Sequence, residues 1–267
     1  MKAVVLEGER SVSVTDVPDP ELPGPDGVLV KVDKTGICGS DLHLYHGALG
    51  GQGVRLGHEF IGTITEVGGD VRTVRTGDRV LVSGVIGCGR CVACLARDPI
   101  VCRNGGLRVF GTSTDLPGGQ AEAAGVPAAD TSVLKIPDGV TDEQAVLLTD
   151  ILPTGYLGAL RADIRPGATV AVIGCGPVGL MTLRCVWMFG PGRVFAVDLV
   201  AERRARAEAL GAEPIDPAEG GSVAQIMDRT GGWGADSVVE AVGADQSISD
   251  AIMCAAPARR SPSSASA

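Results

Sequence analysis

Four cysteines lie within fifteen residues, at Cys88, Cys91, Cys94 and Cys102, with the spacing C-x2-C-x2-C-x7-C. Thiolates this close can bind one tetrahedral zinc ion, bind an iron–sulfur cluster or pair as disulfides. The bacterial ferredoxin run ends with a gap of three and a proline, whereas here the gap is seven and Arg103 follows. Disulfides require an oxidising compartment, and Met1–Arg10 does not read as a signal peptide. The pattern therefore favours a structural zinc site, which uses four Cys ligands at short spacings.

A second group of possible metal ligands comes earlier in the chain. Cys38 stands in CGSDLH and His58 in GHE, each beside a glycine at the predicted end of a strand. Either residue alone would most often be structural. Together with a third ligand from elsewhere they would make an open catalytic zinc site. Asp150 falls where the two halves of the chain, described below, meet.

A G-x-G-x-x-G motif occupies Gly174, Cys175, Gly176, Pro177, Val178 and Gly179. It follows an apolar strand and opens a helix, so its glycines would allow a tight turn and a close approach to a pyrophosphate, which the helix N-terminus attracts. Asp198 ends the next strand, where a carboxylate binds ribose hydroxyls and repels a 2′-phosphate. The motif thus favours NAD over NADP, although Arg203 and Arg204 lie close enough to weaken that preference.

The elements that must position these residues change in kind near residue 150. Residues 1–150 contain short Val- and Thr-rich runs separated by Gly, Pro and Asp, which predicts strands and turns. From residue 151 strands alternate with helices, which predicts βαβ units and a parallel sheet. The predicted strands are 168–174, 193–198, 214–216 and 236–242, and the predicted helices are 178–189, 201–212 and 222–229. The expected fold is α/β, with a β-rich domain over 1–150 and a partial Rossmann domain over 151–254.

Composition excludes several classes of function. The chain has 267 residues, 45% of them hydrophobic, and a net charge of −9. An acidic chain does not suit binding to a nucleic-acid backbone, and we find no apolar run long enough to span a membrane. These features predict a cytoplasmic protein. The other cysteines, Cys175, Cys185 and Cys254, are expected to be buried free thiols.

In these motifs the chain resembles the zinc-dependent medium-chain alcohol dehydrogenases. The resemblance rests on GICGSDLH, GHEFIGTITEVG, the four-cysteine segment, LPTGY and AVIGCGPVGLMTL with the following VFAVD, and it extends to about residue 254. Within the family, VIGCGRCVAC, GGQAE and Asp150 are most similar to the glutathione-independent formaldehyde dehydrogenase branch. The resemblance to the family implies a GroES-like catalytic domain, two zinc ions per chain, a small alcohol or aldehyde substrate and, in full-length relatives, a homo-oligomer.

The resemblance also implies roles for single residues. Cys38, His58 and Asp150 would hold the catalytic zinc, with Glu59 beside it. Ser40 would accept the proton of the zinc-bound alcohol, and His43 would pass that proton to solvent. Asp41 would orient His58 through its second ring nitrogen, Thr154 would pack near the nicotinamide, and the motif residues with Asp198 and Arg203 would bind the cofactor. Three plainer readings stay open: Ser40 or Asp150 as a helix cap, and His43 as a surface residue. His46 is expected to be a surface residue.

Two stretches depart from the family pattern. Ala123, Ala124 and Gly125 stand where bulky residues are usual, which predicts a weakened strand. Residues 255–267 have a Ser/Ala/Pro/Arg bias and read as disordered. Read as GC-rich codons one base earlier, Ser261–Ala267 becomes Val-Ser-Val-Val-Gly-Val-Gly, the apolar strand expected there. This favours the hypothesis of a frameshift that replaced the end of the chain and truncated the Rossmann domain.

Four functions fit these patterns to different degrees. The first is an NAD- and zinc-dependent dehydrogenase that transfers hydride between an alcohol or aldehyde and the cofactor. The second is a truncated zinc-binding remnant without turnover, which activity rather than zinc content would distinguish. The third is a zinc-free quinone reductase, against which Cys38, His58 and the four cysteines argue. The fourth is an iron–sulfur redox module, which a colourless protein would exclude.

Overall fold

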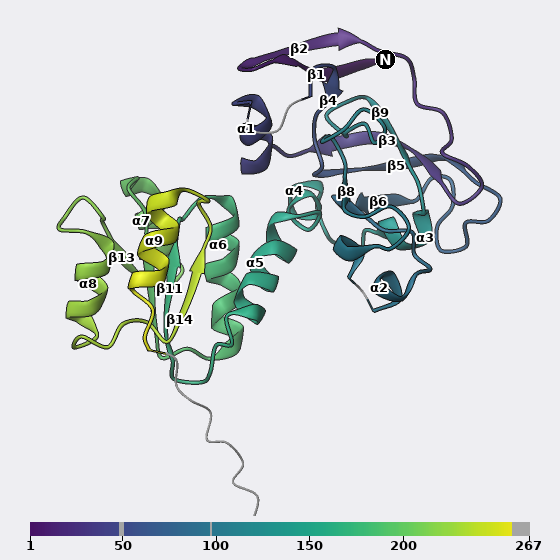
Figure 1. Ribbon diagram of the computed structural model, residues 1–267. Helices are drawn as coiled ribbons and strands as arrows, with labels where there is room; N and C mark the ends of the chain where they lie inside the picture. Colours follow the sequence, from purple (N-terminus) through teal and green to yellow (C-terminus); the bar gives the residue numbers. More distant parts are fainter. Residues whose placement is uncertain (48–50, 97, 258–267) are drawn as a thin grey trace, which may run out of the picture. The chain divides into compact units, whose positions relative to one another are not determined.

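The computed structural model describes residues 1–47, 51–96 and 98–257, and its chain divides into two compact units between Asp150 and Ile151 (Figure 1). Each unit has a hydrophobic core of its own. None of the helices in the described ranges is both long enough and apolar enough to cross a membrane.

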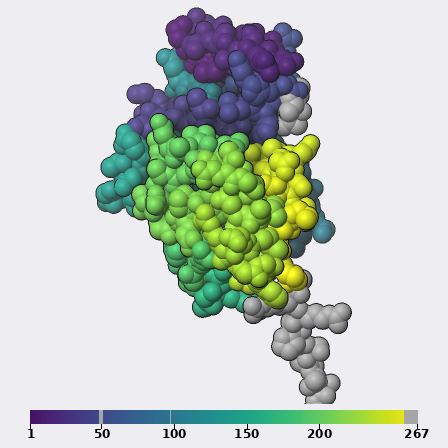
Figure 2. Space-filling view, turned by 90° about the vertical axis from the view of Figure 1, so that its left-hand side faces the viewer, coloured from purple at the N-terminus to yellow at the C-terminus, as the bar shows by residue number. Residues whose placement is uncertain are grey.

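Antiparallel sheets build the first unit. One sheet has the order β2-β1-β4, with strands Ser11–Asp16, Lys2–Gly8 and Val54–Arg55. Its strands β1 and β2, coloured purple, lie on the surface of this unit (Figure 2). A five-stranded sheet has the order β10-β6-β5-β3-β9, with strands Val133–Lys135, Arg79–Val82, Phe60–Val67, Val28–Thr35 and Ala123–Val126. A third pairs β7 (Val85–Ile86) with β8 (Arg108–Val109). The short helices are α1 (Gly39–Tyr45), α2 (Val92–Leu95), the 3-10 helix Pro99–Val101, α3 (Ala129–Ser132) and α4 (Asp142–Leu147).

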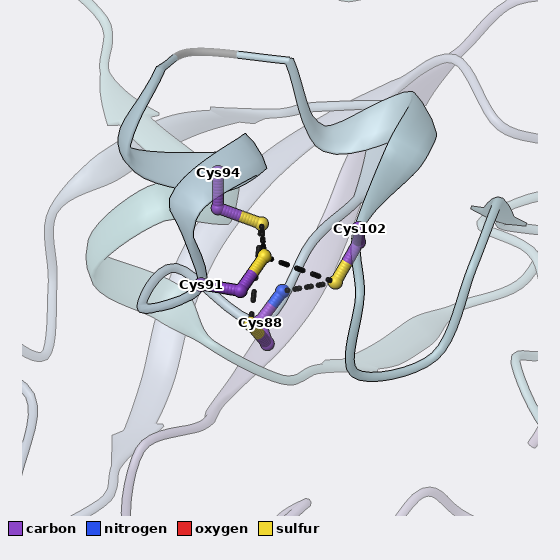
Figure 3. Close-up of side chains that lie close together, drawn as sticks. All are labelled: Cys88, Cys91, Cys94 and Cys102. Carbon is purple, nitrogen blue, oxygen red and sulfur yellow. Dashed lines mark hydrogen bonds between the residues drawn. The ribbon is translucent and has the colours of Figure 1, made fainter.

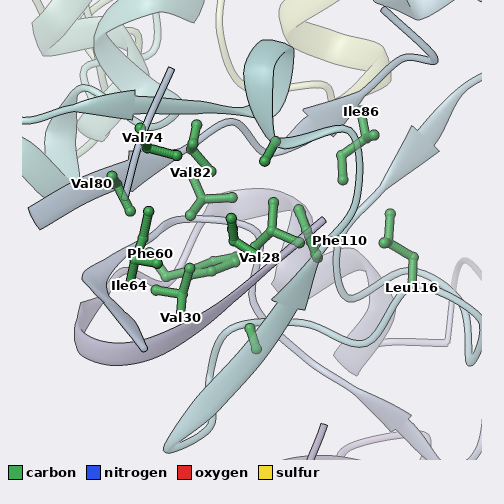
Figure 4. Packing of buried hydrophobic residues seen from close by; sticks show 14 residues of the cluster. Val28, Val30, Phe60, Ile64, Val74, Val80, Val82, Ile86, Phe110 and Leu116 are labelled. Carbon is green, nitrogen blue, oxygen red and sulfur yellow. The ribbon is translucent and has the colours of Figure 1, made fainter. Parts of the chain in front are cut away.

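Alternation along the strands places the core of this unit. On β3, Val28 and Val30 are buried whereas Lys31 is exposed, as expected for side chains that point to opposite faces of a sheet. Valines and isoleucines from neighbouring strands surround Phe60 and Phe110, whose rings meet edge to face with centroids 5.2 Å apart (Figure 4). Burial of these side chains contributes about 25 cal/mol for each Å² of apolar surface removed from water, and the resulting core holds the strand ends that carry the candidate ligands.

The run of small residues in β9 still forms a strand. Ala123–Val126 pairs with β3 along its whole length. A Cβ at Gly125 would lie 3.1 Å from the carbonyl oxygen of Glu21 and 3.2 Å from Cγ of Pro23. A side chain at position 125 would therefore crowd Glu21 and Pro23, a contact between distant segments that the sequence does not reveal.

The second unit is a parallel sheet covered by helices on both faces (Figure 1). Its strand order is β13-β12-β11-β14, with strands Glu213–Ile215, Arg193–Val197, Thr169–Ile173 and Ser237–Glu240. The helices are α5 (Ile151–Arg161), α6 (Pro177–Val186) with the 3-10 turn Trp187–Phe189, α7 (Ala201–Ala209), α8 (Ser222–Arg229) and α9 (Asp245–Met253). On β11, Val170 and Val172 pack in one cluster with α5 and α6, whereas Ala171 and Ile173 pack in another with α8.

The predicted α/β class is confirmed, and the predicted elements after residue 168 occur within a few residues of their expected positions. The helix α9 was not predicted. Ala255, assigned to a disordered tail from the sequence, pairs with Ala235 in a parallel bridge, so order extends at least that far. The frameshift hypothesis concerns residues outside those that the structure describes.

Candidate metal centres and dinucleotide loop

The four cysteines of the first motif converge on one point (Figure 3). Cys88 follows β7, Cys91 precedes α2, Cys94 lies on α2 and Cys102 follows the 3-10 helix. The Sγ atom of Cys91 lies 3.5 Å from that of Cys94 and 4.0 Å from that of Cys102. A tetrahedral ion with Zn–S bonds of about 2.3 Å requires sulfur atoms about 3.8 Å apart, so the cluster fits zinc. All eight cysteines are free, and a disulfide would need sulfurs about 2.05 Å apart.

Backbone and amide groups prepare these sulfurs to carry negative charge. The backbone N–H groups of Cys88 and Arg103 donate to Cys102 and Cys91, and the side-chain amide of Asn104 donates to Cys88. Backbone hydrogen bonds from Cys94 and Arg103 lower the pKa of Cys91 to about 6. Burial, together with the neighbouring thiols, raises the pKa of Cys94 to about 11. A backbone hydrogen bond from Arg90 also lowers the pKa of Cys88. Ionisation of all four thiols, Cys94 included, therefore calls for a cation between the sulfurs, which a structural zinc ion would supply.

The second group of predicted ligands also comes together, within the first unit. Cys38 is the N-cap residue of α1, His58 and Glu59 immediately precede β5, and Asp150 follows α4. One donor atom from each of the four lies within 4.8 Å of the others. Oδ2 of Asp150 is 3.4 Å from Nε2 of His58 and 3.7 Å from Sγ of Cys38. The fold thus brings residues more than a hundred positions apart onto one donor cluster.

Charge in this cluster calls for a cation. Burial works to lower the pKa of His58, but contacts with Asp150, Asp41 and Cys38 outweigh it and raise the pKa to about 12. Burial and the charge of Asp150 raise the pKa of Glu59. Oε1 of Glu59 is buried and has no hydrogen-bond partner among the described residues. Because an unpartnered buried carboxylate oxygen is costly, and thiolate, imidazole and carboxylate are all zinc ligands, this donor set fits a zinc ion.

Two glycines leave room for the cluster. A Cβ at Gly36 would lie 2.1 Å from Oε2 of Glu59, and one at Gly57, whose φ is +99°, would lie 2.5 Å from Cγ of Gln120.

Gln120 itself is buried, and its amide reaches Asp41. In the sequence, Gln120 stands out only as part of the GGQAE motif. The signal that could have found it is a large polar residue between glycines and alanines, in a stretch expected to be a strand.

Ser40 lies beside the second cluster, and the proton relay from Ser40 to His43 stays a prediction. Oγ of Ser40 lies 3.3 Å from Nε2 of His58. His43 is exposed on α1, and among the described residues no hydrogen bond joins it to Ser40, so its relay role stays a prediction. Ser40 does not cap α1: Cys38 holds the N-cap position, and the carboxylate of Asp41 accepts from the backbone N–H of Cys38 at 2.9 Å. His46 is exposed, as expected.

The glycine motif forms the turn between β11 and α6. Gly174 has φ +92°, Gly176 is the N-cap residue of α6 and Pro177 is its first residue, as helix N-termini favour. A Cβ at Gly179 would lie 1.8 Å from the carbonyl oxygen of Gly174, whereas one at Gly176 would meet no atom within 4 Å. Gly179 is thus required by the fold, and Gly176 leaves open space at the helix N-terminus.

Asp198 lies beside this turn, at the end of β12. Its Oδ2 accepts from the backbone N–H of Cys175 at 2.8 Å, and its Oδ1 accepts from that of Val200 at 2.8 Å. Arg203 approaches Oδ2 at 3.6 Å. Asp198 therefore fixes the glycine turn as well as offering a carboxylate next to it. Thr154, predicted to pack near a nicotinamide, is exposed on α5, and Cys175, Cys185 and Cys254 are buried free thiols, as predicted.

Two family models match the chain. The alcohol dehydrogenase GroES-like domain matches residues 24–138, and the zinc-binding dehydrogenase domain matches residues 177–262. The structure of an alcohol dehydrogenase from Thermus sp. ATN1 superposes with a TM-score of 0.89 at 37% identity, covering 98% of this chain and 79% of that one. This chain belongs to the zinc-binding alcohol dehydrogenase family. The resemblance inferred from the motifs is thereby confirmed at the level of the family.

Two curated members of the alcohol dehydrogenase family illustrate its spread. A Mycobacterium tuberculosis protein described as a probable zinc-binding alcohol dehydrogenase is 53% identical over 96% of this chain, and the match spans 66% of its own length. A glutathione-independent formaldehyde dehydrogenase of Bacillus subtilis is 36% identical over 92% of this chain and 67% of its own. Membership of the formaldehyde dehydrogenase branch stays a prediction.

Proposed function

We propose that this protein is a zinc-dependent oxidoreductase that transfers hydride between a small alcohol or aldehyde and NAD. The observation that carries the proposal is the joint presence, in one chain of this family, of two separate metal-ligand clusters and a glycine turn suited to a dinucleotide. A closed four-cysteine site has no coordination position for a substrate, whereas a Cys/His/Asp set does. A cytoplasmic location is a further prediction from the sequence, and the family resemblance implies homo-oligomers for full-length relatives.

The residues of the second cluster have distinct tasks in this proposal. Cys38, His58 and Asp150 hold a zinc ion, with Glu59 as a further donor, and that ion would lower the pKa of a hydroxyl bound to it. Ser40, beside Nε2 of His58, is placed to accept the proton of the alcohol. Asp41 faces Nδ1 of His58 at 3.4 Å and keeps the proton on that nitrogen. His43 passes the proton from Ser40 to solvent.

The glycine turn binds the cofactor in this proposal. The N-terminus of α6 would hold the pyrophosphate, because the helix dipole and free N–H groups there favour negative charge. Asp198 favours the free ribose hydroxyls of NAD, because a 2′-phosphate would meet its negative charge. Arg203 partly compensates that charge, so we expect a preference for NAD rather than exclusion of NADP.

The direct test is a steady-state assay with metal analysis. Purified protein is expected to contain two zinc ions per chain and to reduce NAD⁺ with short-chain alcohols or hydrated formaldehyde, more efficiently than NADP⁺. Two zinc ions without turnover on any of these substrates would support the remnant without activity instead. Absence of zinc would contradict both.

A pair of glycine variants separates folding from cofactor binding. Gly176→Ala is expected to fold with an unchanged Tm, because its Cβ meets no protein atom within 4 Å, yet to bind NAD at least tenfold more weakly, because the methyl group fills the space of the pyrophosphate. Calorimetric titration with NADH measures the affinity.

Gly179→Ala is the contrasting variant. Its Cβ would lie 1.8 Å from the carbonyl oxygen of Gly174, so the turn must shift and the second unit is expected to lose about 1–3 kcal/mol of stability. Equal NADH affinity in Gly176→Ala and wild type would contradict the placement of the cofactor on this turn.

A further inference from the structure

We propose that Gln120 is a positioning residue for the zinc centre: it holds the carboxylate of Asp41 against His58 and so fixes the imidazole that binds the metal. The proposal rests on the proposed function in assuming that this cluster binds zinc. The side-chain hydrogen bonds that Gln120 makes to the described residues go to Gly36 and Asp41, so its effect on His58 would pass through Asp41.

The backbone of Gln120 is anchored on both sides. Its N–H donates to the carbonyl of Leu56 at 3.0 Å, and its carbonyl accepts from the N–H of Val4 at 2.8 Å. Gly57, next to His58, lacks the Cβ that would collide with the Gln120 side chain. The side chain of Gln120 therefore starts from an anchored backbone position, and the missing Cβ of Gly57 leaves room for it beside His58.

The amide of Gln120 meets two acceptors. Nε2 donates to the carbonyl of Gly36 at 3.2 Å and to Oδ2 of Asp41 at 3.4 Å. Both partners are acceptors only, since an ionised carboxylate and a carbonyl have no hydrogen to donate. An amide nitrogen can satisfy both, whereas a carboxylate at position 120 would face two acceptors. The chemistry of the neighbours thus requires a donor in this buried place.

These contacts fix the orientation of Asp41. Its Oδ2 accepts from Gln120 and, at 2.9 Å, from the backbone N–H of Cys38. The other oxygen, Oδ1, accepts no hydrogen bond from the described residues and faces Nδ1 of His58 at 3.4 Å. With one oxygen occupied by two donors, the other is left for His58, which leaves Nε2 for the metal. Partners of this kind fix the tautomer and ring orientation of metal-binding histidines.

The test is a double-mutant cycle on zinc affinity. Gln120→Met removes the amide at similar size, and Asp41→Asn removes the carboxylate. Zinc affinity is measured by competition with a chelator on the full chain, and the four-cysteine site serves as an internal reference. Gln120→Met is expected to weaken binding at the His58 site about tenfold in the wild-type background and to have little further effect in Asp41→Asn. Equal losses in both backgrounds, or no loss, would overturn the proposal.

Two further variants complete the experiment. Gln246→Met is the matched control: Gln246 is exposed and its amide donates to Asp250 at 2.7 Å, so the same substitution should leave zinc affinity unchanged. Gln120→Asn replaces Gln120→Met if methionine prevents folding. It keeps the amide but withdraws it by one methylene, and the same loss and the same coupling with Asp41 are expected. A lower Tm with unchanged zinc affinity would show a merely structural role and overturn the proposal.

Failure of the proposed function has a different signature. A wild-type chain that takes up only the zinc of the four cysteines would refute the metal site at His58. The positioning role is then read from the Nδ1–H proton resonance of His58, which needs no metal. That resonance is expected to shift in Gln120→Met and not in Gln246→Met. An unchanged resonance in Gln120→Met would overturn the role of Gln120 on its own.

Discussion

Replacement of His58 with alanine is expected to lower the zinc content from two ions per chain to one and to reduce alcohol oxidation by several orders of magnitude. His58 is the one imidazole of the second cluster. Without it, the zinc ion loses a ligand, and the carboxylates of Asp150 and Glu59 are left close together without a cation between them. The four cysteines, Cys88 to Cys102, keep their own zinc because none of their contacts involves His58. Metal analysis and the NADH-forming rate measure the two effects.

The matched control for this substitution is His46→Ala. His46 is exposed and contacts the ring of Tyr45, so this variant should retain two zinc ions and the wild-type rate. A His58→Ala protein that still contained two zinc ions would show that the second ion binds elsewhere. Full zinc loss from both sites would indicate instead that the variant fails to fold, which the circular dichroism spectrum would reveal.

The second large effect is expected from Cys102→Ser. A hydroxyl can still accept the N–H of Cys88, but it is a much poorer ligand than thiolate for zinc. Loss of the structural ion leaves three thiols crowded around an empty centre. Because a structural zinc site contributes folding free energy directly, Tm is expected to fall on the order of 10 °C. Differential scanning calorimetry and zinc analysis measure the change.

Cys185→Ser provides the comparison. Cys185 is equally buried but belongs to the core of the second unit, with no part in either cluster. The Cys185→Ser variant should lose some stability, because a buried hydroxyl without a prepared hydrogen-bond partner replaces the thiol. It should keep both zinc ions. If Cys102→Ser lost no more Tm than Cys185→Ser, the four-cysteine site would have no structural function.

Local patterns in the sequence predicted the elements of the second unit and the four-cysteine cluster, whereas the ligand set around His58 was implied by the family resemblance. The glycine turn at Gly174–Gly179 and the cysteine spacing are short-range signals, because strand, turn and helix or four ligands follow one another directly. Contacts made across the fold were not predictable in this way. The reach of Gln120 to Asp41 depends on how β1, β4 and the β9 segment approach one another, and the crossing of Glu21 over Gly125 is likewise invisible in a linear pattern. His43 shows the converse. The motif singled this residue out, but it did not predict that the side chain would be exposed on α1.

The two clusters differ in how far their ligands lie apart along the chain. Cys88 and Cys102 are 14 positions apart, whereas Cys38 and Asp150 are 112 apart. Closing a short loop costs less chain entropy than closing a long one, so the four cysteines can gather around an ion while the rest of the chain is still unfolded. The donors around His58 come from distant segments, so we expect them to meet only after the sheets of the first unit have formed. We therefore expect the four-cysteine site to take up its metal before the site around His58 does.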